Sequence, residues 1–275
     1  MTGRLPMRPA TFAGKVVWIT GASSGIGEAL AYAAAAAGAQ VVVSGRRSEE
    51  LARVATACAG ELEPLVLPLD LTRPQDFAPA AAAVQERFGR IDVLVNNAGV
   101  GQRALAQDTL PAVERAIMEV NYFGVVGLTK AVLPVLLAQR SGSVVAISSV
   151  MGYIGTPRRA AYAASKHALH GWFDSLRAEI GPQGIHVCLV CPGYVRTALS
   201  QHALTADGGA HARLDRGQAR GIAPERAAAA VLRAIARRHD EVYVGGPEVW
   251  AVRLKRHAPR LWNWLLGCAV ERGWI

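Results

Sequence analysis

The sequence predicts an α/β fold with a doubly wound parallel sheet of about seven strands and helices on both faces. Strand-length apolar runs alternate along the chain with longer segments rich in alanine, leucine and charge, the pattern of repeated strand–helix units. The runs are apolar throughout, which is typical of parallel strands covered on both faces. A glycine-rich turn, TGASSGIG at 20–27, joins the first run to the first helical segment. These observations together favour one open, doubly wound sheet.

The predicted strands follow one another at regular intervals. They are VVWIT (around 17–20), QVVVSG (40–45), PLVLPLD (64–70), IDVLVNNAG (91–99), GSVVAISS (142–149), IHVCLVCPG (185–193) and EVYVGG (241–246). No internal repeat or low-complexity linker marks a second core. One stretch, 194–222, lacks clear periodicity, and loops of that length are usually functional. We therefore expect one domain over 1–246, with 194–222 as its substrate loop, followed by a C-terminal extension over 247–275.

Composition limits the class of protein. The chain has 275 residues, 51% of them hydrophobic, so it can bury a large core. Its net charge is +9, but the arginines are spread along the chain and not clustered with aromatics, so we expect no nucleic-acid binding. The excess is either ordinary surface charge or a basic patch for an anionic ligand or membrane surface. We find no apolar signal-peptide core and no run of about 18 uncharged apolar residues, which predicts a soluble, cytoplasmic protein.

The four cysteines are Cys58, Cys188, Cys191 and Cys268. CLVC at 188–191 superficially matches a redox or metal-binding pair, but it lies in a run that predicts a buried strand. An odd offset in a strand sends the two side chains to opposite faces. Because no second pair of cysteines or histidines occurs at ligand spacing, we interpret these cysteines as buried structural thiols and expect no metal.

The glycine-rich turn is suited to a dinucleotide. Gly21 makes the turn, and Gly25 and Gly27 allow close approach of a pyrophosphate and close packing of helix on strand. Ser23 and Ser24 can donate hydroxyl groups, and the helix N-terminus offers free N–H groups and a positive dipole end. On this motif alone, a purely structural role for the glycines stays open.

The spacing T-G-x-x-x-G-x-G resembles the glycine motif of the short-chain dehydrogenase/reductase family, which has a Rossmann fold. The other signatures of that family follow in order: Asp70, NNAG at 96–99, Asn121, Ser149, YAASK with Tyr162 and Lys166, and Pro192 with Gly193. The resemblance covers about residues 12–245. It implies an enzyme that moves a hydride between a nicotinamide cofactor and a carbonyl or secondary alcohol. It also implies a homodimer or homotetramer, formed through long helices around 110–138 and 159–180.

The end of the second strand indicates which cofactor is bound. An acidic residue there would hold the ribose 2′-hydroxyl of NAD(H) and repel the 2′-phosphate of NADP(H). Gly45 stands in that place and Arg46 follows, so we expect NADP(H). Arg47 is either a second phosphate contact or a solvated arginine before the next helix. Asp70 is either an adenine contact or a helix N-cap.

The family resemblance implies further cofactor contacts. They are Ile26 in the glycine turn, Leu71 beside the adenine, Asn97, Ala98 and Gly99 along the cofactor, Tyr162 and Lys166 at the nicotinamide ribose, and Pro192, Gly193, Val195 and Thr197 over the nicotinamide.

Tyr162 and Lys166 are four residues apart, so on a helix they share one face. A nearby ammonium would stabilise a phenolate and lower the pKa of Tyr162, which then gives its proton to the substrate oxygen. Ser149 would hold that oxygen. Its neighbour Ser148 is the competing choice, and the serine-to-tyrosine offset of the family selects Ser149. The resemblance gives Asn121 the role of holding a water that links Lys166 to solvent.

Two segments resemble the dehydrogenase/reductase member 7 branch of that family, particularly its B form. They are HALTADGG, within the 194–222 loop, and the tail WAVRLKRHAPRLWNWLLG at 250–267. This resemblance implies an apolar, lipid-like or steroid-like carbonyl substrate. The competing function is an NADP(H)-binding sensor or scaffold without activity, and the presence of both Tyr162 and Lys166 argues against it.

The tail is basic and rich in tryptophan. From Pro259 on, its apolar residues recur at helical spacing: Leu261, Trp262, Leu265, Leu266, Ala269 and Val270. Three uses compete, namely packing into the core of the same subunit or a partner, closing over the substrate pocket, and lying on an anionic membrane. We expect the first, with the tail docked beside the 194–222 loop.

Overall fold

The computed structural model describes residues 11–60 and 63–272, which form a parallel sheet of seven strands. The strands are β1 (Val16–Thr20), β2 (Gln40–Gly45), β3 (Leu65–Pro68), β4 (Val93–Asn96), β5 (Gly142–Ile147), β6 (Ile185–Pro192) and β7 (Glu241–Val244). Their order across the sheet is β3-β2-β1-β4-β5-β6-β7, and each neighbouring pair is parallel. This confirms the predicted doubly wound sheet, and every predicted run contains one strand.

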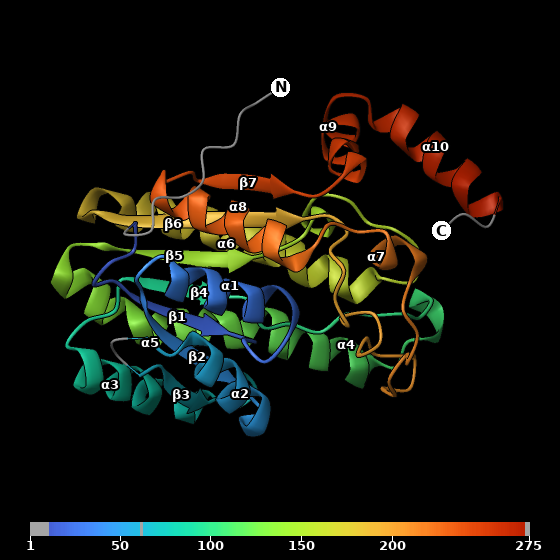
Figure 1. The fold of residues 1–275 in the computed structure, drawn as a ribbon. Coiled ribbons are helices and arrows are strands. Elements are labelled where there is room, and N and C mark those ends of the chain that lie inside the picture. The colour runs from blue at the N-terminus through green and yellow to red at the C-terminus, as the bar shows by residue number, and fades with distance from the viewer. Residues whose placement is uncertain (1–10, 61–62, 273–275) are drawn as a thin grey trace.

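Helices cover both faces of the sheet (Figure 1). The α-helices are α1 (Gly25–Ala36), α2 (Ser48–Cys58), α3 (Phe77–Phe88), α4 (Pro111–Met118), α5 (Gly124–Gln139), α6 (Ala160–Ile180), α7 (Arg216–Ala219), α8 (Pro224–Ala236), α9 (Trp250–His257) and α10 (Pro259–Glu271). The 3₁₀ turns are η1 (Pro74–Asp76), η2 (Ala106–Asp108), η4 (Val150–Gly152), η5 (Gly181–Gln183) and η6 (Pro247–Val249). Buried side chains of α1, α2 and α8 form one core, and those of α3, α5 and α6 form the other.

The carboxyl ends of the parallel strands carry the predicted site segments. The glycine turn follows β1, and the segment that begins at Asn96 follows β4, its neighbour in the sheet. The chain order reverses direction between these two strands, and ligands of open α/β sheets bind at such a switch point. The fold therefore brings the sequence motifs to one edge of the sheet.

A five-residue π-turn, η3 (Glu119–Phe123), joins α4 to α5 in one continuous helix. By length and composition, this helix over Pro111–Gln139 is apolar enough to cross a membrane, and 44% of its most apolar window is buried inside the protein. Core helices share that composition, and here buried side chains of α5 pack in the core beside α3 and α6. The apolar sequence of this helix thus has a packing role in the fold.

The predicted substrate loop, 194–222, contains the short helix α7 and is tied to the rest of the chain by isolated bridges. Val195 pairs with Ile222 at the two ends of the loop, and Leu204 pairs with Gln102 after β4. The backbone N–H groups of Ile222 and Leu204 donate across these bridges at 3.0 Å. The two ends of the loop therefore pair with each other, and its middle pairs with the segment that follows β4.

The C-terminal extension forms α9 and α10. Val252 of α9 is buried against a cluster that includes Met151 and Tyr162, and Trp262 of α10 packs against the same cluster. No residue of α10 is buried, however, and Leu261 and Leu265 are 46% and 40% exposed. The expected packing of this stripe into a core is therefore not met within the subunit, because α10 touches the body on one side only. Packing of its exposed side against a partner stays a prediction.

The cysteine thiols behave as the strand pattern predicts. Cys58, Cys188 and Cys191 are buried, Cys268 is partly exposed, and all four are free. Burial raises the pKa of Cys58 to about 11 and that of Cys188 to about 12, so these thiols stay protonated. Cys188 belongs to the core beneath α1 and α8, whereas Cys191 lies on the other side near His170.

Candidate active site

The glycine turn adopts backbone that only glycine accepts readily. Gly21 and Gly25 have φ values of +63° and +61°. A Cβ at Gly21 would lie 2.8 Å from the Cα of Ala98, and one at Gly25 would lie 3.0 Å from the methyl group of Thr197. Gly27 lies against the turn itself, since its Cβ would overlap the carbonyl oxygen of Gly21. The glycines thus let three segments meet, and Gly25 faces the Thr197 side chain, a contact the motif alone did not indicate.

Helix α1 starts directly at this turn with open hydrogen-bond donors. Its N-cap, Ser24, makes no side-chain cap, so the first N–H groups of the helix keep their capacity to bind an anion. Together with the positive φ angles, this arrangement fits a dinucleotide pyrophosphate. Ile26 follows within the first turn of the helix and packs against the core beneath it.

Asn97 shapes the turn from the neighbouring strand end. Its Nδ2 donates to the carbonyl oxygens of Thr20 at 2.9 Å and Gly21 at 3.2 Å. The Thr20 hydroxyl oxygen accepts from the backbone N–H groups of Asn97 and Ala98 at 3.0 and 3.1 Å. Thr20, which sequence reasoning did not select, therefore joins the two strand ends. The cofactor contacts of Asn97 and Ala98 stay predictions.

Two arginines stand at the end of β2. Arg47 donates through Nη2 to the hydroxyls of Ser23 at 2.9 Å and Ser24 at 3.0 Å, and its contact with a phosphate stays a prediction. Arg46 is exposed on the same segment and acts electrostatically on Asp70. A cluster of guanidinium groups beside the glycine turn has the charge that a 2′-phosphate requires.

Asp70 is bound within its own turn. Its Oδ1 accepts from the N–H and the hydroxyl of Thr72, each at 2.9 Å. Burial alone would raise the pKa of Asp70, but these hydrogen bonds and the charges of Arg46 and Arg73 hold it below its usual range. The N-cap of α3 is Asp76, so the alternative of Asp70 as that cap is wrong. Leu71 is buried, and its predicted contact with the adenine stays a prediction.

Ser148 and Ser149 have different surroundings in the structure. The Ser148 hydroxyl lies 2.7 Å from Nε2 of the buried His170, away from the cavity. Ser149 caps η4, where its Oγ accepts from the N–H of Met151 at 3.1 Å and donates to the carbonyl of Pro192 at 3.3 Å. Ser149 also lines the main cavity, so it is the serine that can reach a substrate.

Tyr162 and Lys166 lie on consecutive turns of α6, as their spacing predicts. The Lys166 Nζ donates to the carbonyl of Ile147 at 2.8 Å and lies 5.8 Å from the centroid of the Tyr162 ring. Burial lowers the pKa of Lys166 to about 8. Asn121 lies in the π-turn, fully buried, and its Nδ2 donates to Ser165 Oγ at 3.0 Å. Helices with such a turn often carry functional residues there.

Gly99 lies between the remaining members of the site. A Cβ at this position would lie 3.1 Å from Oδ1 of Asn121 and 3.7 Å from Nζ of Lys166. Asn121 also exchanges hydrogen bonds with the backbone of Val100, at 2.8 and 2.9 Å. The predicted residues Asn121, Ser149, Tyr162 and Lys166 therefore meet around the segment that follows β4.

The charges that act on Tyr162 differ from the expectation. Burial raises the pKa of the phenol, and a hydrogen bond with Ser149 and then the charges of Arg103 and Arg159 lower it. We had expected that lowering from Lys166, whose ammonium instead donates to Ile147. Burial outweighs these lowering effects, so the pKa of Tyr162 lies above its ordinary value.

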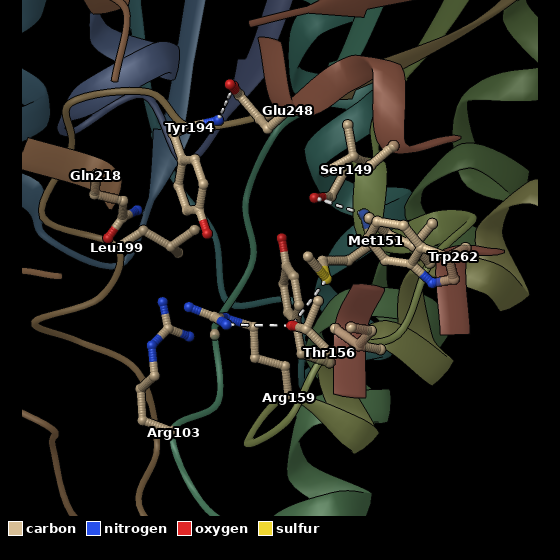
Figure 2. A pocket seen from close by; sticks show the side chains of 17 residues that line it. Arg103, Ser149, Met151, Thr156, Arg159, Tyr194, Leu199, Gln218, Glu248 and Trp262 are labelled. Atoms are coloured by element: carbon tan, nitrogen blue, oxygen red, sulfur yellow. Dashed lines mark hydrogen bonds between the residues drawn. The ribbon is translucent and has the colours of Figure 1, made fainter. Parts of the chain in front are cut away.

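Arg103 and Arg159 line an open cavity of about 190 Å³ together with Ser149 and Tyr162. Figure 2 shows the two guanidinium groups next to each other on one side of the cavity, with Met151 and Trp262 on the other. The apolar part of the lining comes from Val150, Met151, Ile154, Leu199, Ala251, Trp262 and Leu266. The tail and the 194–222 loop thus flank the same cavity, where we predicted the tail to dock.

One carboxylate serves both arginines. Asp215 Oδ2 accepts from Nε of Arg103 at 2.7 Å and from Nη2 of Arg159 at 3.3 Å. Their side chains are only 11% and 15% exposed. Burial, and then the charge of Arg103, lower the pKa of Arg159, as expected for a cation that is not fully compensated. The arginine side of the cavity therefore carries a local excess of positive charge, while Glu248 is an acidic residue elsewhere on the lining.

Two further residues hold the site and were missed by sequence reasoning. Gln102 is fully buried, and its Oε1 accepts from the N–H groups of Ala161 at 2.8 Å and Tyr162 at 3.3 Å at the start of α6. Glu248 accepts through Oε1 from the N–H groups of Tyr194 at 2.8 Å and Gly246 at 2.9 Å. Both pair with residues far away in the chain, so no local motif marks them.

The segment after β6 lies beside the glycine turn, and its predicted contacts with a nicotinamide stay predictions. Gly193 lies against Glu248, where a Cβ would overlap the carboxylate, and Val195 is 4% exposed. The Thr197 hydroxyl accepts from the N–H of Leu199 at 3.4 Å and from Gln218 Nε2 at 3.4 Å. Because the side chain of Thr197 faces Gly25, this segment lies over the glycine turn, as expected of residues that cover a nicotinamide.

Comparison with known proteins identifies the family. The family model described as short chain dehydrogenase matches residues 15–207. Dehydrogenase/reductase SDR family protein 7-like of Anopheles gambiae is 44% identical over 266 residues, which cover 94% of this chain and 84% of the relative. Dehydrogenase/reductase SDR family member 7B of Bos taurus is 42% identical over 265 residues, which cover 94% of this chain and 82% of the relative.

Solved structures agree with this result. A short chain dehydrogenase/reductase from Burkholderia phymatum in complex with NAD has a TM-score of 0.80 and 26% identity, covering 91% of this chain and 96% of that one. An alcohol dehydrogenase from the archaeon Thermococcus sibiricus complexed with 5-hydroxy-NADP has a TM-score of 0.73 and 26% identity, covering 85% and 97%. Structural neighbours thus include complexes with both kinds of nicotinamide dinucleotide.

The fold and the site define an oxidoreductase, and the chain belongs to the short-chain dehydrogenase/reductase family. Within that family its similarity is to the member 7 and 7B branch, as the loop and tail motifs predicted. Dimer or tetramer formation, cytoplasmic location and the lack of nucleic-acid binding stay predictions.

Proposed function

We propose that this protein is an NADP(H)-dependent oxidoreductase that interconverts a carbonyl group and a secondary alcohol on a largely apolar substrate. The observation that carries the proposal is that Ser149 and Tyr162 line a mostly apolar cavity, while Lys166 follows Tyr162 on α6 and lies near Asn121 at Gly99. A sensor or scaffold without activity would not need a buried phenol and serine facing that cavity.

The residues of the chain divide the chemistry among them. When bound, the dinucleotide supplies a hydride to the carbonyl carbon or accepts one from the alcohol. Tyr162 gives its proton to the carbonyl oxygen, and the Ser149 hydroxyl donates a hydrogen bond to the same atom as charge develops there. The guanidinium groups of Arg103 and Arg159 stabilise the phenolate that remains. Lys166, with a pKa of about 8, can return a proton near neutral pH.

NADP(H) is favoured by the end of β2. The glycine there leaves out the carboxylate that would hold a ribose 2′-hydroxyl, and the hydrogen bonds from Arg47 to Ser23 and Ser24 bring a guanidinium group to the glycine turn. Exposed Arg46 adds a second positive charge. A 2′-phosphate in this place would meet two cations, Arg46 and Arg47, with the carboxylate of Asp70 near Arg46.

The lining of the cavity favours a substrate with an apolar body and an anionic or strongly accepting group. Its apolar lining, from Met151 to Leu266, favours a lipid-like or steroid-like body. The shared carboxylate of Asp215 leaves Arg103 and Arg159 with excess charge, which favours a carboxylate, phosphate or strongly accepting oxygen near the carbonyl. We infer that an apolar ketone with an anionic group near the reacting carbon is reduced faster than its neutral counterpart.

The test is turnover of NADPH with matched pairs of ketones, with and without an anionic group. Tyr162→Phe should lower kcat by about 10²- to 10⁴-fold while the dissociation constant for NADPH is kept, because only the proton donor is removed. Tyr243→Phe, at an exposed position of β7, is the matched control and should behave as the parent. Near-parental turnover of Tyr162→Phe would disprove the assignment, and NADPH binding without turnover of any ketone would favour the sensor.

A further inference from the structure

The outer face of the C-terminal helix α10 exposes large apolar side chains. Leu261, Trp264 and Leu265 are 46%, 63% and 40% exposed. Residues three and four apart lie on one side of a helix, so these three form one stripe. Trp250, at the start of α9, is 61% exposed. Figure 1 shows α10 running along the outside of the molecule, beyond α9.

The same two helices are strongly basic. Arg253, Arg256 and Arg260 are exposed, whereas the described part of α9 and α10 contains a single acidic residue, Glu271. The Arg253 guanidinium lies 4.6 Å from the ring centroid of Trp250, so cation and aromatic side chain already share one site on the surface. A surface that combines indoles with arginines matches the boundary between anionic headgroups and acyl chains.

The inner side of these helices lines the substrate cavity. Trp262 and Leu266 of α10 and Ala251 of α9 belong to its wall. The inner face of α9 and α10 thus forms part of the cavity wall, and the outer face of the same helices carries the exposed apolar side chains. A substrate that dissolves in a bilayer would therefore leave it directly beside the wall of the cavity.

A second copy of the chain is the other candidate occupant of this surface. In a twofold contact the same patch meets itself, so the exposed arginines of both copies would come together. No described acidic cluster on α9 or α10 is available to compensate them. Charge complementarity thus favours an anionic surface over self-association.

We propose that α9 and α10 dock the protein on an anionic lipid bilayer, with Leu261, Trp264 and Leu265 in the interface and the arginines on lipid phosphates. This role goes beyond the proposed oxidoreductase activity and does not depend on it. Docking on this face places the cavity wall formed by Trp262 and Leu266 next to the membrane.

The experiment is flotation of the full chain with vesicles of phosphatidylcholine, alone or mixed with phosphatidylglycerol. We expect binding to the anionic vesicles that weakens as salt is added. Trp264→Ser with Leu265→Ser should weaken the partition coefficient by at least about tenfold, because two apolar side chains leave the interface. Arg253→Gln with Arg256→Gln should weaken it roughly 30-fold, at about fivefold for each charge near an anionic surface.

Matched controls change the same chemistry elsewhere. Leu110→Ser removes another exposed leucine, and Arg226→Gln with Arg237→Gln removes two exposed charges from α8 and its C-cap. Both should bind vesicles as the parent does. The proposal is overturned if the parent does not float with anionic vesicles, or if the tail variants float as well as the parent. It is also overturned if Trp264→Ser with Leu265→Ser reduces the oligomer size in light scattering, which would assign this face to a second copy.

Discussion

The glycine turn and the substrate cavity hold their shapes by different means. At the turn, backbone geometry holds the shape: two glycines with positive φ angles let β1, α1 and the segment after β4 meet. The side chain of Asn97 then donates hydrogen bonds to main-chain carbonyl groups of the turn. In the cavity, side chains hold the shape, because Arg103 and Arg159 hydrogen-bond to Asp215 of the 194–222 loop. Few substitutions are compatible with the backbone geometry of the turn, whereas substitutions of the lining side chains can change the shape and charge of the cavity. The cofactor side is therefore constrained and the substrate side adaptable.

The largest expected effect lies on the cofactor side. Gly25→Val should weaken NADPH binding by about 100-fold or more, because a branched side chain at φ +61° is strained and its Cβ would press on Thr197. The strain should also cost on the order of 1–3 kcal/mol of stability. Isothermal titration calorimetry and thermal unfolding measure both quantities.

The control for this variant is Gly89→Val. Gly89 has a φ of +71° with nothing within 4 Å of an added Cβ, so it carries similar strain far from the turn. It should lose stability and keep its affinity for NADPH. Equal loss of affinity in the two variants would mean that general strain, and not the turn, governs cofactor binding.

A smaller effect is expected at the end of β2. Arg46→Ala should weaken NADPH binding by roughly 10- to 100-fold and leave NADH binding nearly unchanged, because only NADPH carries the 2′-phosphate. Arg73→Ala removes another arginine whose charge acts on Asp70 and should spare the preference. If Arg46→Ala reduced the affinity for both cofactors equally, the argument for NADP(H) would be wrong.

The smallest effect concerns pH on the substrate side. Arg159→Gln removes a positive charge that lowers the pKa of Tyr162, so that pKa should rise further. The phenolate is the base in alcohol oxidation, and the pH profile of kcat/KM for oxidation should therefore shift to higher pH. Carbonyl reduction near neutral pH, which needs the protonated phenol, should change less. Arg87→Gln, an exposed arginine on α3, is the control, and an unshifted profile for Arg159→Gln would remove this arginine from the mechanism.

The two regions also differ in how far the sequence reveals them. The glycine turn, Ser149, Tyr162 and Lys166 lie in short motifs with fixed spacing, because local backbone geometry and one helix face set their positions. Asp215 lies 112 residues from Arg103, and Glu248 lies 54 residues from Tyr194. Pairs at such separation leave no local pattern.

The π-turn at Asn121 and the exposure of α10 escaped prediction for a related reason. Helical spacing of apolar residues in the tail indicated a buried stripe, but spacing alone does not tell which surface a stripe meets. Likewise, one more residue in a helical turn changes no residue type and leaves the apolar pattern of α4 and α5 nearly intact. Both features depend on the three-dimensional surroundings of the helix.

The hydrogen bonds of Glu248 bear on how this enzyme can be engineered. One carboxylate from the C-terminal extension holds the first residue of the 194–222 loop and the end of β7 together. A chimera that takes the 194–222 loop from a relative but keeps the native extension would combine a loop with a Glu248 contact that did not evolve with that loop. Specificity should therefore be transplanted as a pair of segments, the loop and the chain from Pro247 onward, with the crossover placed before Glu248.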